Sequence, residues 1–283
     1  MARIESAGVV GAGTMGHGIA QVLAQAGVRT RLFDLSHDKV EHGLAQLTGN
    51  LDQGIARGKV TAEQKAATLG LLTTAVQLEQ LADCDLIIEA VPEQLALKLE
   101  LFAKLSALCR PDALLATNTS CLSVTEIAAA ATHPSRVVGM HFFNPVHVMK
   151  LLELVRPLQA SDQTLARARE LGARLGKELV EVNDHPGFAS SRLGILLGME
   201  AIRMVEEGVG SAADIDRAME LGYGHPMGPL KLTDLVGLDV RLAIAEYLYA
   251  ELGSPAFRPP QLLKKLVRAG KLGRKSGEGF YRY

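Results

Sequence analysis

Short apolar runs alternate with longer amphipathic segments from residue 6 to residue 183. The runs are rich in β-branched residues and are bounded by Gly, Pro, Asn or Asp, whereas the segments between them carry apolar residues at helical spacing. This alternation is typical of βαβ units, so it predicts a mostly parallel sheet with helices packed on it. The expected strands are Ser6–Val10, Thr30–Phe33, Asp85–Glu89, Ala113–Ala116, Arg136–His141, Lys150–Val155 and Glu178–Val182.

The helices of this region are expected between those strands. Thr61 is followed three residues later by Gln64, which fits a capping box and predicts the start of a short helix. The expected helices are Thr14–Ala26, Ser36–Arg57, Thr61–Leu69, Glu93–Leu108, Val124–Ala131 and Gln163–Leu175.

The pattern changes at residues 183–187, where Asn-Asp-His-Pro-Gly breaks both helix and strand. Almost everything that follows has a helical period. We therefore expect two domains, residues 1–184 with the sheet and residues 185–283 built of helices alone. The expected helices of the second domain are Phe188–Glu207, Ala212–Leu221, Gly228–Val236, Leu238–Leu252 and Pro260–Ala269.

The first helix of the second domain is apolar on almost every side between Phe188 and Val205. Such a helix has to be covered all round. A small helical domain does this with difficulty, so we expect a second subunit to help, which predicts a homodimer formed through this domain. The alternative is a helix buried entirely within its own chain.

Composition narrows the class of protein. Hydrophobic residues make up 48% and charged residues 22% of the chain, which is ordinary for a soluble globular protein. The net charge of −1 and the absence of Trp argue against a nucleic-acid partner. The longest apolar stretch, Leu193–Met199, is too short for a membrane span. Three cysteines without CxxC spacing favour neither disulfides nor a metal, and with no secretory signal in view we expect a cytoplasmic protein.

A glycine-rich turn joins the first expected strand to the first expected helix. In GxGxxG the first glycine permits a tight turn, the second lets the backbone approach a pyrophosphate, and the third allows close helix–sheet packing. The acidic Asp34 ends the next strand, where a carboxylate accepts hydrogen bonds from the adenine ribose and repels a 2′-phosphate. We therefore expect a Rossmann-type domain that binds NAD; the alternative is a glycine turn with a surface Asp. The candidate cofactor residues here are Gly11, Gly13, Thr14, Met15, Gly16 and Asp34.

Four further runs are more specific than the glycine loop. They are Asn118-Thr-Ser120, Gly139-Met-His-Phe-Phe-Asn-Pro145, Lys150-Leu-Leu-Glu153 and Gly277-Glu-Gly-Phe-Tyr281. With them the chain resembles the L-3-hydroxyacyl-CoA dehydrogenase family from the glycine loop to the last residues, and within it the stand-alone bacterial 3-hydroxybutyryl-CoA members. The resemblance implies NAD-dependent oxidation of an acyl-CoA substrate, most simply 3-hydroxybutyryl-CoA, to the 3-ketoacyl-CoA.

His141 is the expected catalytic base. Oxidation of a secondary alcohol needs a group that accepts the hydroxyl proton, and histidine titrates near neutral pH. Glu153, on the next expected strand, is placed to accept the imidazole N–H and to orient the ring, as the acid of a catalytic triad does. The resemblance implies the same two roles. It also implies that Ser120 holds the substrate's 3-oxygen and that Asn144 contacts the nicotinamide side. The alternative for His141 is a core histidine.

The remaining candidates come from the resemblance alone. It implies further cofactor contacts at Glu93, Lys98 and Lys275, and contacts with the CoA nucleotide at Asn50 and Arg57. Asn50 and Arg57 are seven residues apart and so share one helical face. The alternatives are an ordinary solvated charge for Lys98 and Lys275, and a solvated helix face for Asn50 and Arg57. For Glu93 the alternative is a helix N-terminal acid favoured by the dipole.

One position departs from the family pattern. The family usually carries Asn at the start of the first C-terminal helix, where this chain has Ser191. A serine is shorter and loses the second group of the amide. We still expect Ser191 to form a hydrogen bond on the substrate side of the pocket. The alternative is that it caps the helix or packs in its first turn.

Two other functions stay open from the sequence. One is a dehydrogenase of a free hydroxy acid or sugar acid such as L-gulonate, carrying the same His–Glu pair. The other is a non-catalytic, crystallin-like NAD-binding protein on the same fold, which fold alone does not exclude.

Overall fold

The computed structural model describes residues 3–283; Met1 and Ala2, which belong to the expected first domain and to the stretch searched for a secretory signal, lie outside the described residues. The chain divides into two compact units, a sheet unit ending at Asp184 and a helical unit from His185 to Tyr283. Within residues 3–283 no helix is both long enough and apolar enough to cross a membrane.

The sheet unit is built on one eight-stranded sheet in the order β3-β2-β1-β4-β5-β6-β7-β8. Every neighbouring pair is parallel except β6 and β7, which are antiparallel. The strands are β1 (Ser6–Val10), β2 (Arg29–Phe33), β3 (Leu72–Ala75), β4 (Leu86–Glu89), β5 (Leu114–Thr117), β6 (Val137–Phe142), β7 (Leu151–Arg156) and β8 (Glu178–Asn183).

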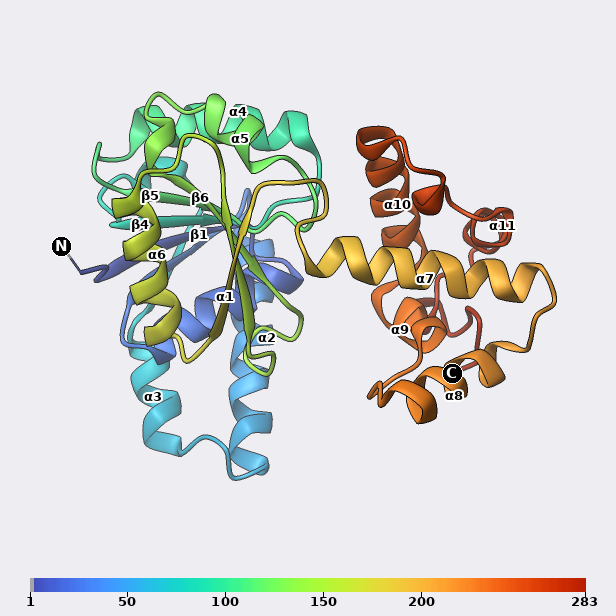
Figure 1. The fold of residues 1–283 in the computed structure, drawn as a ribbon. Helices are drawn as coiled ribbons and strands as arrows, with labels where there is room; N and C mark the ends of the chain where they lie inside the picture. The colour runs from blue at the N-terminus through green and yellow to red at the C-terminus, as the bar shows by residue number, and fades with distance from the viewer. Residues whose placement is uncertain (1–2) are drawn as a thin grey trace. The chain divides into compact units, whose positions relative to one another are not determined.

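Helices cover both faces of this sheet, with α4 and α5 over one face and α1 and α6 over the other (Figure 1). The capping box predicted at Thr61 is confirmed: its hydroxyl accepts the Gln64 N–H at 3.1 Å, and the Gln64 side chain accepts the Thr61 N–H at 2.8 Å. The helices are α1 (Thr14–Gln25), α2 (His37–Ala56), α3 (Ala62–Gly70), α4 (Leu95–Leu108), α5 (Val124–Ala129) and α6 (Asp162–Arg174), with short 3₁₀ turns at Leu78–Leu81 and Pro134–Arg136.

The helical unit contains α7 (Ser190–Glu206), α8 (Ala212–Tyr223), α9 (Pro229–Val236), α10 (Leu238–Leu252) and α11 (Gln261–Arg268), with 3₁₀ turns at Pro255–Phe257 and Arg274–Ser276. One face of α7 packs into the core of this unit through residues such as Ile195 and Ile202, whereas Leu193 is 66% exposed. The buried carboxylate of Asp234 accepts the backbone N–H groups of Phe280 and Tyr281, both at 2.9 Å, and so ties the final segment to α9.

The predicted fold class, a mostly parallel sheet followed by a helical unit, is confirmed. Two details differ from the expectation. The edge strand β3 was not predicted, because it is only four residues long and its two threonines are exposed. The helix expected from Glu93 begins at Leu95 with Gln94 as its N-cap, so Glu93 directly precedes α4 and is not in its first turn.

Candidate active site

The glycine loop follows β1 at the carboxyl edge of the sheet. Gly11 has φ of +103°, and a Cβ built there would lie 2.7 Å from the Ala90 carbonyl oxygen. A Cβ on Gly16 would overlap the Gly11 carbonyl oxygen, whereas a Cβ on Gly13 would meet no atom within 4 Å. Gly11 and Gly16 thus serve the turn and the packing, and Gly13 leaves open space at the start of α1. This arrangement fits a dinucleotide pyrophosphate, which needs bare backbone N–H groups.

Asp34 is fixed beside this loop by backbone donors. Its Oδ2 accepts the Ala12 N–H at 2.9 Å, and its Oδ1 accepts the Leu35 N–H at 2.7 Å. The Lys39 ammonium lies 3.6 Å from Oδ1 and is largely exposed. A carboxylate held directly after β2 fits the two hydroxyls of an adenine ribose better than a 2′-phosphate.

His141 and Glu153 lie directly opposite each other in the antiparallel β6–β7 pair. Opposed residues point to the same face of a sheet, and His141 Nδ1 lies 2.8 Å from Glu153 Oε2. His141 is 5% exposed and Glu153 is 1% exposed, so the contact is shielded from water. The Phe143 ring packs 4.4 Å from the imidazole, centroid to centroid. The hydrogen bond expected from sequence is therefore present.

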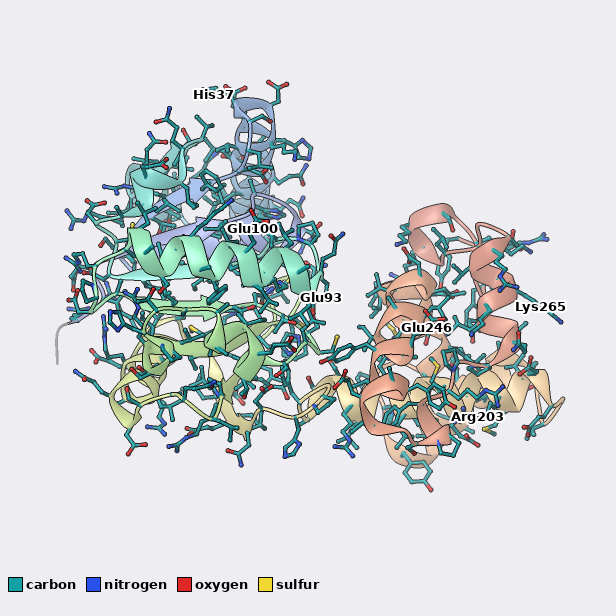
Figure 2. All side chains as sticks on the ribbon, turned by 90° about the horizontal axis from the view of Figure 1, so that it is seen from above. His37, Glu93, Glu100, Arg203, Glu246 and Lys265 are labelled. Carbon is teal, nitrogen blue, oxygen red and sulfur yellow. The ribbon has the colours of Figure 1, made fainter. Side chains whose placement is uncertain are left out.

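Ser120 lies just beyond β5 and is held through its backbone. Glu93 accepts the Ser120 N–H at 2.7 Å and the Thr119 hydroxyl at 2.6 Å with the same oxygen. Its other oxygen lies 3.3 Å from the Lys98 ammonium. Figure 2 shows Glu93 just before the start of α4. Two residues that the sequence linked to the cofactor therefore also position the segment that carries Ser120.

Glu89 is a functional candidate that the sequence analysis missed. It is the last residue of β4 and fully buried, and it accepts the Lys98 ammonium at 2.6 Å, the Thr117 hydroxyl at 2.7 Å and the Val91 N–H at 2.8 Å. Lys98 is buried as well, so it is not a solvated charge. An acid that closes an apolar strand, with a lysine in the helix that follows, was the available signal.

The ends of β5 and β6 are tied together by Asn118, whose side-chain oxygen accepts the Phe142 N–H at 2.8 Å. This bond fixes the residue next to His141 relative to the segment that leads to Ser120. Asn144 lies in the exposed loop after β6, and its peptide bond to Pro145 is cis. Four features thus lie at the carboxyl edge of the sheet, where open α/β sheets bind ligands. They are the glycine loop, Asp34, the Glu89 network and the His141–Glu153 pair.

The other predicted residues lie elsewhere. Asn50, on α2, donates to the Gln21 side chain at 3.2 Å, and Arg57 is exposed at the end of that helix. Ser191 and Lys275 belong to the helical unit. Ser191 is half-buried in the first turn of α7, whose N-cap is Ala189, so it does not cap the helix. Lys275 pairs with Asp239 at 2.6 Å.

Comparison with known proteins places this geometry in a family. Residues 6–185 match the model of the 3-hydroxyacyl-CoA dehydrogenase NAD-binding domain, and residues 187–283 match the model of the 3-hydroxyacyl-CoA dehydrogenase C-terminal domain. The chain belongs to the 3-hydroxyacyl-CoA dehydrogenase family. It is accordingly an NAD-dependent enzyme, as the glycine loop and Asp34 predicted.

Similar dehydrogenases cover nearly the whole chain. A Bacillus subtilis protein named as a probable 3-hydroxybutyryl-CoA dehydrogenase is 46% identical over 97% of this chain and 96% of its own. The solved structure of Mycobacterium tuberculosis FadB2 is 45% identical, with a TM-score of 0.97 over 100% of both chains. The (S)-3-hydroxybutyryl-CoA dehydrogenase PaaH1 of Ralstonia eutropha is 41% identical, with a TM-score of 0.95 over 99% of both chains.

Proposed function

We propose that this 3-hydroxyacyl-CoA dehydrogenase oxidises short-chain L-3-hydroxyacyl-CoA, 3-hydroxybutyryl-CoA first among them, to the 3-ketoacyl-CoA. The observation that carries the mechanism is the buried His141–Glu153 pair, at the same sheet edge as the glycine loop and Ser120. The names of the relatives at 41–46% identity support the acyl group.

In the forward direction His141 accepts the proton of the 3-hydroxyl group. Because Glu153 engages Nδ1, we assign the proton transfer to Nε2. The carboxylate fixes the tautomer and stabilises the imidazolium that forms. The Ser120 hydroxyl forms a hydrogen bond with the 3-oxygen of the substrate while the charge on that oxygen changes. NAD⁺, when bound, supplies the acceptor for the hydride that leaves C3.

The remaining predicted residues surround this centre in the proposal. Those assigned to the cofactor are Gly11, Gly13, Thr14, Met15, Gly16, Asp34, Glu93, Lys98, Asn144 and Lys275. Asn50 and Arg57 are assigned to the CoA nucleotide; the exposed guanidinium of Arg57 suits a phosphate. Ser191 is assigned to the reacting end of the acyl group.

We further propose that the enzyme is a homodimer formed through the helical unit. Leu193, Leu221 and Tyr223 are 66%, 74% and 78% exposed. Leu193 lies on α7, whose other side packs into the core of the unit, so a second copy would cover the side that is left exposed. Sedimentation of the pure protein tests this directly, and a monomer would exclude it.

Reduction of acetoacetyl-CoA, followed by loss of NADH absorbance, tests the function. We expect turnover with acetoacetyl-CoA and none with free acetoacetate or L-gulonate. In His141→Gln, kcat should fall roughly 10²-fold or more with NADH affinity little changed. Activity on the free acids would favour the sugar-acid alternative, and complete inactivity with intact NADH binding would favour the non-catalytic one.

A further inference from the structure

Arg241 is a buried charge in the helical unit that the proposed mechanism does not use. It lies on α10 and is 6% exposed. Its Nη1 donates to the Gly194 carbonyl oxygen at 2.8 Å, and its Nε is buried without a partner. Among residues 3–283 no carboxylate lies within ion-pair distance of it. Burial alone lowers the pKa of this guanidinium to about 10.

An arginine in this state is incompletely satisfied. A guanidinium has five N–H donors in a planar fork, and one backbone carbonyl takes only one of them. Burying a cation without a counter-charge is costly, so buried arginines are normally paired with a carboxylate or phosphate. Since Nη1 is engaged and Nε is buried, Nη2 is the donor left to bind a carboxylate.

Two glycines of α7 make room for this group. A Cβ built on Gly194 or Gly198 would lie 3.7 or 3.5 Å from Arg241 Nη1, so any longer side chain there would compete with the guanidinium. Figure 1 shows α10 beside α7 in this unit. The helix therefore presents bare backbone where it meets the buried charge.

The same face of α7 carries Ser191. Ser191, Gly194 and Gly198 are spaced i, i+3 and i+7, which places them along one side of the helix. At 1.5 Å per residue, Gly194 lies about 4.5 Å and Gly198 about 10 Å beyond Ser191 along the axis. A group bound at Ser191 can reach the guanidinium only through a short extension along this face.

We propose that Arg241 binds the terminal carboxylate of an acyl group, so that the enzyme acts on short 3-hydroxyacyl-CoA esters of dicarboxylic acids. This rests on the proposed function, in which Ser191 faces the reacting end of the acyl group. In a six-carbon diacid, three C–C bonds of about 1.5 Å separate C3 from the carboxyl carbon. A charge-assisted hydrogen bond adds about 2.8 Å. The sum, about 7 Å, lies between the axial distances from Ser191 to Gly194 and to Gly198, the two glycines of α7 that lie against Arg241 Nη1.

The test compares two thioesters of equal carbon number, 3-oxoadipyl-CoA and 3-oxohexanoyl-CoA, which differ only in a carboxylate or a methyl group at the end. We expect the wild-type enzyme to have the higher kcat/KM for 3-oxoadipyl-CoA. In Arg241→Met the ratio of the two kcat/KM values should fall about thirtyfold or more, as expected when one partner of a buried charge pair is removed. Arg241→Lys keeps the charge but loses the planar fork of donors, so its ratio should lie between those of the wild type and Arg241→Met.

The matched control is Arg217→Met, at an exposed arginine on α8, which should leave the ratio at the wild-type value.

A second measurement needs no variant: adipyl-CoA should raise the wild-type thermal midpoint more than hexanoyl-CoA does. Equal shifts, or a ratio that Arg241→Met does not change, would overturn the proposal. An unchanged ratio with weakened self-association would assign the counter-charge to a second copy of the chain. Failure to reduce acetoacetyl-CoA would instead count against the proposed function itself.

Discussion

Replacing Lys98 by Met tests whether the buried network at the sheet edge acts as an ion-paired unit. The ammonium lies 2.6 Å from Glu89 and 3.3 Å from Glu93, and the Lys98 and Glu89 side chains are 1% and 0% exposed. Met has nearly the same length, so it fills the space and removes only the charge. The Glu89 carboxylate would keep its bonds from Val91 and Thr117 but lose the ammonium.

The expected cost follows from that geometry. Breaking a buried ion pair by removing one partner destabilises a protein by about 3–5 kcal/mol. Two donors still solvate the Glu89 carboxylate, so we expect the lower end of that range, ~3 kcal/mol. A typical domain has about 5–15 kcal/mol of stability, so the variant should stay folded at 25 °C. Glu89→Gln in the same background removes the unpaired charge and should restore about 1–2 kcal/mol.

Urea unfolding followed by circular dichroism gives the stabilities, and NADH oxidation gives the activity. Because Lys98 contacts the carboxylate that holds the Ser120 N–H, kcat should fall in Lys98→Met even where the protein is fully folded. A variant within about 0.5 kcal/mol of wild type would show that the pair is not coupled to folding. If the double variant Lys98→Met/Glu89→Gln loses as much unfolding free energy as the two single variants together, Lys98 and Glu89 do not act as an ion-paired unit.

Three further outcomes are expected. Glu153→Gln should lower kcat roughly 10²-fold or more, because the imidazole loses the acid that orients it; an unchanged rate and pH profile would disprove the pairing. Asp34→Asn keeps an acceptor for the Ala12 N–H but removes the charge, so the ratio of kcat/KM for NADH over NADPH should narrow at least tenfold; a wild-type preference for NADPH would contradict the assignment. Ser191→Ala should lower kcat/KM for acetoacetyl-CoA about tenfold, one hydrogen bond of ~1.4 kcal/mol, at an unchanged thermal midpoint; the reverse pattern would make Ser191 structural.

The strands and helices with strong periodicity were predictable from the sequence, and so was the contact between His141 and Glu153. Both depend on local pattern: continuous apolar runs mark strands that are buried on both faces, and two neighbouring strands bring the pair together. β3 was not predictable on these grounds. It is short, lies at the sheet edge and exposes its threonines, so pairing with β2 rather than burial holds it in place.

The Glu89–Lys98 pair was missed for a different reason, although an acid at the end of an apolar strand was visible in the sequence. Lysine is rarely buried, and sequence alone does not tell which of the charges on an amphipathic helix turns inward. Lys98, in the first turn of α4, does so because its ammonium meets the Glu89 carboxylate at the end of β4. The same holds for Arg241, whose partners on α7 are glycines that carry no side-chain signal of their own.

The placement of the proposed base and its orienting acid on two paired antiparallel strands ties the geometry of the site to the register of those strands. Side chains alternate between the faces of a strand, so a slip of β7 against β6 by one residue would turn Glu153 away from His141. The same slip would exchange the faces to which Leu152 and Leu154 point, and both side chains are fully buried. Burial therefore specifies the register strongly. The core packing that fixes this register also fixes the contact between His141 and Glu153.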